Sequence, residues 1–144
     1  MFLFIVITVT SCSDEDDKTI SSSVDPTPVI NIVSTGTWKI TFYEDSGVNE
    51  TSNFTGYNFS FGAGNLLSTT NVTNTYSGTW SVTDTNSNDD SLNDLDFNIA
   101  FSSPADFFDL TDDWDIVSRT DTKIVLIDIS GGSGGTDYLT FEKN

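Results

Sequence analysis

The chain has 144 residues, of which 36% are apolar and 12% aromatic, enough to fill the core of one domain. Five basic against 22 acidic residues give a formal net charge of −17, which repels phosphate backbones and argues against a nucleic-acid partner. The sequence has no histidine and a single cysteine, Cys12, which removes His-based acid–base chemistry, His-ligated metals and a disulfide framework. With no motif for catalysis on carboxylates alone, we expect a non-catalytic protein without a cofactor.

An apolar run occupies residues 1–10, too short to cross a bilayer but long enough for the apolar segment of a secretion signal. The run ends at Val9, Thr10, Ser11 and Cys12, and this tetrapeptide resembles a bacterial lipobox, in which small residues precede a cysteine that becomes acylated. The resemblance implies that residues 1–11 are a signal peptide and that Cys12 becomes the lipid-anchored N-terminus. The alternative, a buried cysteine in an N-terminal strand, is disfavoured by the polar residues that follow.

Acidic residues at 13–17 follow the cysteine directly and resemble the export tag that sends some Gram-negative lipoproteins to the outer face of the outer membrane. The alternative is an ordinary solvated linker. Residues 18–32 are rich in Ser, Thr and Pro without a sustained period, so we expect residues 12–33 to form a flexible tether. The expected partner is then the outer membrane, reached through acylated Cys12. A single domain over 34–144 would face either the cell surface, as the acidic tag favours, or the periplasm.

Short segments with alternating apolar and polar residues, separated by turn residues, predict an all-β domain. The first expected strand covers residues 36–43, with Trp38, Ile40 and Phe42 facing inward and Tyr43 facing outward. The remaining expected strands cover 56–62, 66–76 (with Val72 and Tyr76 inward), 77–83, 95–101, 114–119, 124–129 and 138–143. The strand at 124–129 is apolar on both faces, so it is expected to be central or covered on its outer side.

Residues 104–110 break the strand period and predict one short helical turn, with Ser103 as N-cap and Pro104 at the first position. The side chains of Phe107, Phe108 and Leu110 would then cover an apolar part of the β domain. Eight strands with hairpin-length connections favour an antiparallel up-and-down barrel, which leaves no open edges. A two-sheet sandwich is the competing architecture.

Gly36, Thr37 and Trp38 resemble the Gly-x-Trp opening of lipocalin-like barrels, and the chain as a whole is most similar to small lipocalin-like lipoproteins of Gram-negative bacteria. In that family the tryptophan closes one end of the barrel beneath a basic side chain of a late strand. The resemblance implies that Trp38 takes this position and that Lys143 is its basic partner. An eight-stranded barrel is wide enough either to fill with its own side chains or to hold one small ligand, here expected to be apolar.

Candidate ligand-binding residues are aromatic side chains expected near the barrel interior, with those at 107 and 108 acting as a lid: Trp38, Phe42, Phe59, Phe61, Trp80, Phe97, Phe107 and Phe108. Dense packing of ordinary interiors favours a core role for most of them. The alternative function is a structural or interaction module with a packed barrel, which docks to a surface partner or glycan through exposed residues such as Tyr43.

A weak calcium candidate lies in the polar loop that follows the second Gly-Thr-Trp strand. Its alternating oxygen-bearing residues are Asp84, Asn86, Asn88 and Asp90. Residue 89 is Asp where the helix–loop–helix calcium motif has Gly, and residue 95 is Leu where the motif has Glu. A solvated hairpin loop is the favoured interpretation, so no metal site is expected.

Overall fold

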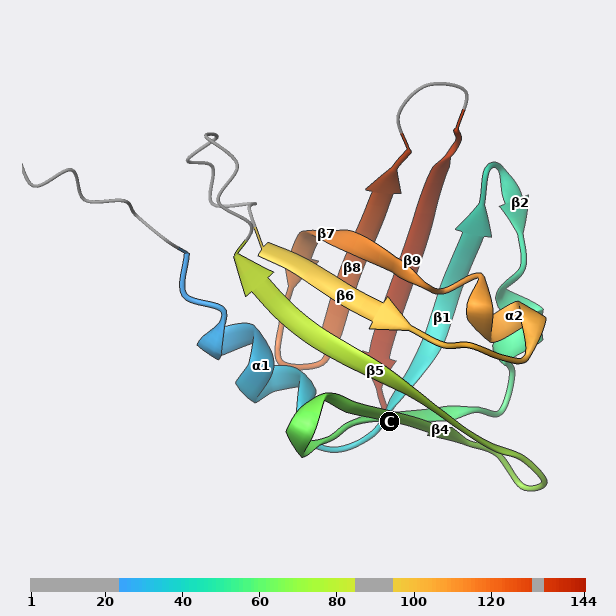
Figure 1. The fold of residues 1–144 in the computed structure, drawn as a ribbon, viewed down its shortest axis with the longest axis horizontal. Helices are drawn as coiled ribbons and strands as arrows, with labels where there is room; N and C mark the ends of the chain where they lie inside the picture. Colours follow the sequence, from blue (N-terminus) through green and yellow to red (C-terminus); the bar gives the residue numbers. More distant parts are fainter. Residues whose placement is uncertain (1–23, 85–94, 131–133) are drawn as a thin grey trace, which may run out of the picture.

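The computed structural model describes residues 24–84, 95–130 and 134–144, which form a closed antiparallel β-barrel with short helical segments (Figure 1). The elements are α1 (Thr27–Val33), β1 (Trp38–Asp45), β2 (Val48–Asn49), η1 (Thr51–Phe54), β3 (Asn58–Phe61), η2 (Ala63–Asn65), β4 (Leu66–Thr70), β5 (Thr75–Asp84), β6 (Leu95–Ala100), α2 (Ala105–Phe108), β7 (Asp112–Arg119), β8 (Lys123–Ile129) and β9 (Thr136–Lys143). Here η denotes a 3-10 helix.

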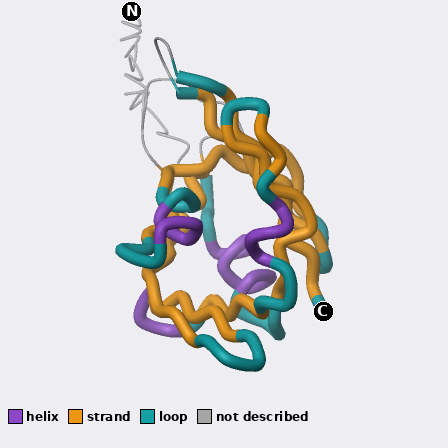
Figure 2. Tube along the Cα trace, turned by 90° about the vertical axis from the view of Figure 1, so that its right-hand side faces the viewer, coloured by secondary structure: helices purple, strands orange, loops and turns teal. Residues whose placement is uncertain are grey.

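Eight of these strands close the barrel in the order β1-β3-β4-β5-β6-β7-β8-β9 and back to β1, and the strands trace a ring in Figure 2. The predicted eight-stranded up-and-down barrel is therefore confirmed. The ninth strand, β2, is an extra two-residue strand paired with the end of β1. Ser46 and Gly47 between them both have positive φ (47° and 87°), as a two-residue hairpin turn requires.

Closure is uneven around the ring. β1 pairs with β9 along most of its length, from Trp38↔Lys143 to Glu44↔Tyr138, but it meets β3 only at Trp38↔Phe59. Away from Trp38, the space between β1 and β3 is taken by η1, whose Phe54 is buried against Tyr43 at 5.4 Å between ring centroids.

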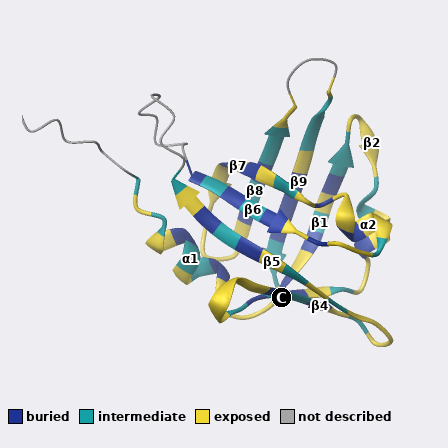
Figure 3. Cartoon of the chain, viewed as in Figure 1, coloured by how far each residue is buried: buried dark blue, intermediate teal, exposed yellow. Residues whose placement is uncertain are grey.

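Alternating burial follows the strand period, as the banding along β5 and β6 shows in Figure 3. On β6, Leu95, Phe97 and Ile99 point into the barrel, while Asp96 and Asn98 are only partly buried. The core is one continuous cluster of apolar side chains drawn from every strand of the ring and from α1 and α2. The core thus fills the barrel with the protein's own side chains.

The prediction for the end of β1 was wrong. Register with β9 shifts between Ile40 and Phe42, so Thr41 is an extra bulged residue and the alternation inverts beyond it. Phe42 is consequently 37% exposed on the outer face, and Tyr43 is buried with its hydroxyl donating to the Asp109 carbonyl at 2.9 Å. Because Tyr43 is buried, it offers no exposed polar surface to a glycan.

The single strand predicted over 66–76 is also wrong, because the chain reverses at 71–74 and makes two strands, β4 and β5. The Asn71 side-chain oxygen accepts the backbone N–H groups of Thr73 and Asn74 at 2.9 and 2.7 Å, which fixes the turn. Val72, expected to face inward, is fully exposed at the tip, whereas Tyr76 does pack against the core.

Residues 27–33 are helical, although the sequence predicted a tether up to residue 33. Val29 and Val33 are four residues apart on one face of α1, and both are completely buried against the barrel. The Trp38 indole N–H donates to the Val33 carbonyl at 3.0 Å, so α1 is tied to the first strand. Lys143 Nζ lies 4.9 Å from the centroid of the Trp38 ring, which confirms the predicted Trp38–Lys143 contact.

The short helix predicted near 104–110 is present as α2, but its N-cap differs. Helical geometry begins at Ala105, so Pro104 and not Ser103 occupies the N-cap position. No side chain caps the helix, because proline has no side-chain oxygen to accept a backbone N–H. Phe107 is buried and Phe108 is 56% exposed, so only the first of the two covers the core. Leu110 is completely buried, as expected.

Phe107 is the centre of the aromatic packing at the α2 end of the barrel. Its ring centroid lies 5.0 to 6.0 Å from those of Phe54, Tyr57, Phe59, Tyr76 and Phe101. These contacts join η1, β3, β5 and the connection after β6. The Phe107 side chain therefore closes the end of the barrel where β1 and β3 are no longer paired.

We expect Phe107→Ala to lower the free energy of unfolding by about 3–5 kcal/mol, because it opens a cavity among aromatic rings that cannot collapse onto it. Phe108→Ala, next to it but exposed, should change the free energy of unfolding by less than about 0.5 kcal/mol. Urea unfolding followed by circular dichroism measures both variants. Similar effects of the two substitutions would contradict the packing described for α2.

Candidate functional site

A cleft of about 660 Å³ opens at the end of the barrel where α1 lies, between α1, the β3–β4 connection and β5. This volume is in the range of pockets that bind small molecules. Its lining consists of Ile30, Ser34, Phe61, Gly62, Ala63, Gly64, Asn65, Trp80, Ser81, Val82 and Thr83.

The floor of the cleft is apolar. Phe61, Trp80 and Val82 are 3, 7 and 6% exposed, and the half-buried Ile30 of α1 faces them from the other side. The Trp80 ring is held by edge contact with Phe61 (5.4 Å between centroids) and by stacking on Phe97 (6.1 Å). These contacts present a fixed aromatic surface to whatever enters the cleft.

The rim is polar but uncharged. Ser34, Asn65 and Thr83 are exposed there, and the indole N–H of Trp80 donates to the Gly62 carbonyl at 3.0 Å. None of the eleven lining residues carries a charge, in a chain whose formal net charge is −17. An anionic ligand would therefore find no cation in this lining to offset the cost of leaving water.

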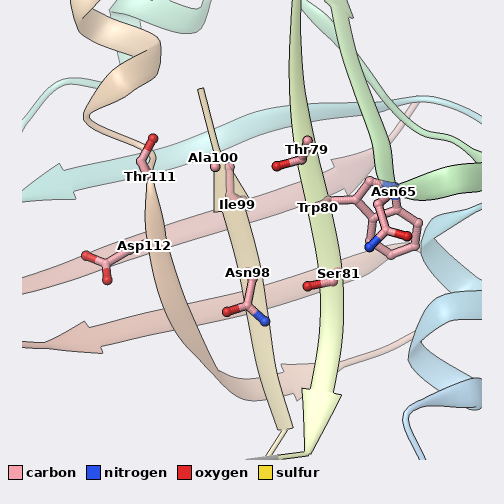
Figure 4. A pocket seen from close by; sticks show the side chains of 9 residues that line it. All are labelled: Asn65, Thr79, Trp80, Ser81, Asn98, Ile99, Ala100, Thr111 and Asp112. Carbon is pink, nitrogen blue, oxygen red and sulfur yellow. The ribbon is translucent and has the colours of Figure 1, made fainter. Parts of the chain in front are cut away.

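A smaller groove of about 290 Å³ is lined by residues of β5, β6 and β7 (Figure 4). Figure 4 shows Thr79 and Ser81 pointing from β5 toward β6, while Trp80 points the other way and lies beside Asn65. The groove and the cleft share Asn65, Trp80 and Ser81. The cleft is larger and has the apolar floor, so the cleft is the better candidate for a ligand.

The structure separates the aromatic residues proposed for ligand binding. Phe61 and Trp80 come together in the cleft, and Phe42 and Phe108 lie on the outside of the barrel. The others are enclosed among core side chains: Trp38, Phe59, Phe97 and Phe107. Sequence reasoning missed the contribution of α1 to the cleft, although the spacing of Val29 and Val33 after Pro26 and Pro28 is a signal of a short amphipathic helix.

Several sequence hypotheses fall wholly or mostly outside the described residues. They include the signal peptide at 1–11, the lipidation of Cys12 and the acidic run at 13–17. In the calcium candidate, Asn86, Asn88 and Asp90 also lie outside that part of the chain, and the remaining member, Asp84, accepts the backbone N–H of Val24 at 2.9 Å. This bond attaches the segment before α1 to the end of β5.

Three carboxylates converge at the opposite end of the barrel. Oxygens of Asp112, Asp128 and Asp137 lie within 4.8 Å of one another, close enough for one hard cation such as Ca²⁺ to contact all three. Each carboxylate also accepts a hydrogen bond from the chain: Asp112 from the Asp113 N–H (2.9 Å), Asp128 from the Ser130 hydroxyl (2.8 Å) and Asp137 from the Ser46 N–H (2.7 Å). These bonds fix the β1–β2 turn and the ends of β7 and β8.

Burial and the neighbouring carboxylates of Asp128 and Asp113 raise the pKa of Asp112 to about 6. A raised pKa means that the folded chain holds this proton more tightly than the unfolded chain does. The resulting contribution to stability is complete below the unfolded pKa of 3.8 and is lost as the pH rises through about 6. At neutral pH the ionised Asp112 therefore destabilises the barrel.

Asp112→Asn should stabilise the protein at pH 7.5, by about 1 kcal/mol once solvent screening of this partly exposed group is allowed for, and should have little effect at pH 4. Asp121→Asn removes the same charge from an exposed turn residue and serves as the matched control. Urea unfolding at the two pH values measures the difference. Equal effects of the two substitutions at pH 7.5 would show that the ionised carboxylate of Asp112 does not destabilise the folded protein.

No protein-family model matches the chain, and no curated protein matches it. A search of solved structures finds the crystal structure of a DUF4847 family protein from Bacteroides vulgatus, with 16% sequence identity and a TM-score of 0.50 over 81% of this chain and 97% of that one. No helix within the described residues has the length and apolar character needed to cross a membrane. At this identity the likeness shows the fold alone, and that fold is compatible with a lipocalin-like barrel.

Proposed function

We propose that this protein is a lipid-anchored, non-catalytic binding protein, which holds a small neutral ligand with an apolar body in the cleft between α1 and β5. The observation that carries the proposal is the uncharged cleft of about 660 Å³ with Phe61, Trp80 and Val82 as its floor. The interior of the barrel is filled by aromatic side chains, so the cleft at its end offers more room than the centre.

The class of ligand follows from the lining. Indole and phenyl surfaces favour an apolar body, and the exposed Ser34, Asn65 and Thr83 can exchange hydrogen bonds with hydroxyl or amide groups. A carboxylate or phosphate would have to give up water without gaining a cation. The proposed ligand is therefore neutral, which sets it apart from a free fatty acid.

Anchoring through Cys12 would place this cleft at a membrane surface. Support for it is confined to the sequence: the lipobox-like residues 9–12, the apolar run before them and the acidic run after them. The first described residues, from Val24 to α1, lie against the end of β5, so a chain rising from an acylated Cys12 reaches the barrel beside the cleft.

Two dyes that differ by one sulfonate test the cleft in the full-length chain: neutral N-phenyl-1-naphthylamine and anionic 8-anilino-1-naphthalenesulfonate. We expect saturable fluorescence enhancement with the neutral dye and at least about tenfold weaker binding of the anionic one, because the lining has no cation. Ala63→Trp, which fills the rim, should weaken neutral-dye binding by about tenfold, whereas Ala105→Trp on α2 should not. Equal binding to both variants would place the dye elsewhere.

Mass spectrometry of the chain extracted from membranes tests the anchor. We expect an N-terminus at Cys12 that carries acyl chains, and a Cys12→Ala variant that keeps its signal segment and loses the lipid. The matched control is Ser13→Ala, which should be processed normally. An unmodified Cys12 in the native protein would refute the anchor and leave the proposal for the cleft standing.

A further inference from the structure

Strand β5 has a neighbouring strand on both sides for only part of its length. β4 pairs with β5 from Thr75 to Thr79, where the register ends at Leu66↔Thr79, and β6 pairs with β5 from Thr79 to Asp84. Residues 80–84 therefore have β6 on one side and, among the described residues, no strand on the other. We call residues 80–84 the open edge.

The connection between β3 and β4 explains why β4 stops where it does. If the register continued, Asn65 would lie opposite Trp80 and Gly64 opposite Ser81, but Gly64 and Asn65 have positive φ (68° and 62°) and cannot extend a strand. The Trp80 indole N–H donates to the Gly62 carbonyl at 3.0 Å, and Trp80 lies beside Asn65 (Figure 4). A side chain thus joins this connection to β5 in place of a backbone ladder.

The open edge faces the cleft. Trp80, Ser81, Val82 and Thr83 belong to the lining of this space of about 660 Å³, which Ile30 of α1 also lines. In an antiparallel ladder, alternate residues direct their backbone N–H and C=O groups to one neighbouring strand, and the others direct theirs to the opposite side. Every second residue of the open edge therefore directs N–H and C=O groups away from β6, and no group in the described part of the chain bonds to them.

The usual protections of a strand edge are missing from residues 80–83. Proteins block exposed edges with charged side chains, proline or a bulge, because an unpaired edge is ready to pair with another strand. Residues 80–83 are Trp, Ser, Val and Thr, and their register with β6 is unbroken. The one charged member of the open edge is Asp84 at its end, whose carboxylate accepts the Val24 N–H at 2.9 Å. The edge is therefore left available to a ligand inside the cleft.

We propose that the ligand of the cleft is a short uncharged peptide, which adds to β5 as an extended strand. This inference rests on the proposed function and names the ligand class. An extended peptide supplies one amide N–H and one C=O at every second residue, at the spacing with which the open edge presents its own. A ligand with a single hydroxyl or amide group would leave most of these backbone groups unpaired.

The side chains around the open edge define the sequence that fits. Trp80 and Val82 are buried and form the floor with Phe61, whereas Ser81 is half-buried and Thr83 is exposed. Neighbouring strands place paired side chains on the same face, so the peptide residues beside Trp80 and Val82 reach the floor and should be apolar. The residues that alternate with them lie at the polar rim. The preferred peptide therefore alternates apolar and small polar residues over about five positions, roughly 17 Å.

Displacement of neutral N-phenyl-1-naphthylamine from the full-length chain tests the ligand class. The probe is acetyl-Thr-Val-Thr-Val-Thr-amide, and its matched controls are N-methylated at both valines or at the second and third threonines. In an added strand, only one of these two sets directs its N–H groups to β5. We expect the parent peptide to displace the dye below about 1 mM, one methylated form to bind at least about tenfold more weakly, and the other to bind within about threefold of the parent.

Equal affinities of the two methylated peptides, or no displacement by the parent peptide, would overturn the inference. Binding of the dye alone tests the proposed function, so that function stands if the dye binds and the peptide does not displace it.

Hydrogen exchange followed by NMR tests the strand pairing without the dye. In the free full-length chain, alternate amides of residues 80–84 should exchange rapidly, and saturating parent peptide should slow them by at least about tenfold. The intervening amides, which bond to β6, should be unchanged and serve as the internal control. Protection of all five amides before peptide is added would show that the edge is already covered. That result, or no new protection with peptide, would overturn the inference.

Discussion

Buried indole N–H groups must find acceptors, and in this barrel the three tryptophans find them outside the strand ladders. Trp38 donates to Val33 at the end of α1, Trp80 to Gly62 in the β3–β4 connection, and Trp114 to Leu110 just after α2, each at 3.0 Å. Carbonyls at helix ends and turns are available because they are not used in sheet pairing. These bonds fasten the connecting segments onto the barrel, and the position of the cleft follows from them.

An interior filled by aromatic rings moves any binding function to the surface of the barrel. The uncharged cleft beside Trp80, at the α1 end of the barrel, is the surface on which the proposed binding depends. The high negative charge is concentrated elsewhere, including the three carboxylates at the α2 end, where it costs stability at neutral pH. The proposed function therefore depends on a surface that the acidic composition leaves uncharged.

Much of the fold could be predicted from the sequence because alternation, turn residues and the Gly-x-Trp opening are local signals. The strands containing Phe97, Trp114 and Phe141 were found in this way, whereas the contact between Trp38 and Lys143 was implied by the resemblance to lipocalin-like barrels. The bulge at Thr41 could not be found, since it arises from the register with β9, and it reversed the orientations of Phe42 and Tyr43. Of the candidate site, Phe61 and Trp80 were identified, but the cleft also needs α1 and the backbone of 62–65, whose positions depend on tertiary contacts.

The proposed function requires that ligand enters at Trp80 while the packed interior stays closed. Fluorine NMR of the full-length chain labelled with 5-fluorotryptophan reports on it directly, because the three indoles occupy the α1 end, the cleft and the interior beneath α2. During titration with neutral N-phenyl-1-naphthylamine, the account predicts a saturable shift of the Trp80 resonance with those of Trp38 and Trp114 unchanged. A saturable shift of Trp114 without one of Trp80 would show that the ligand enters the barrel and would contradict the account.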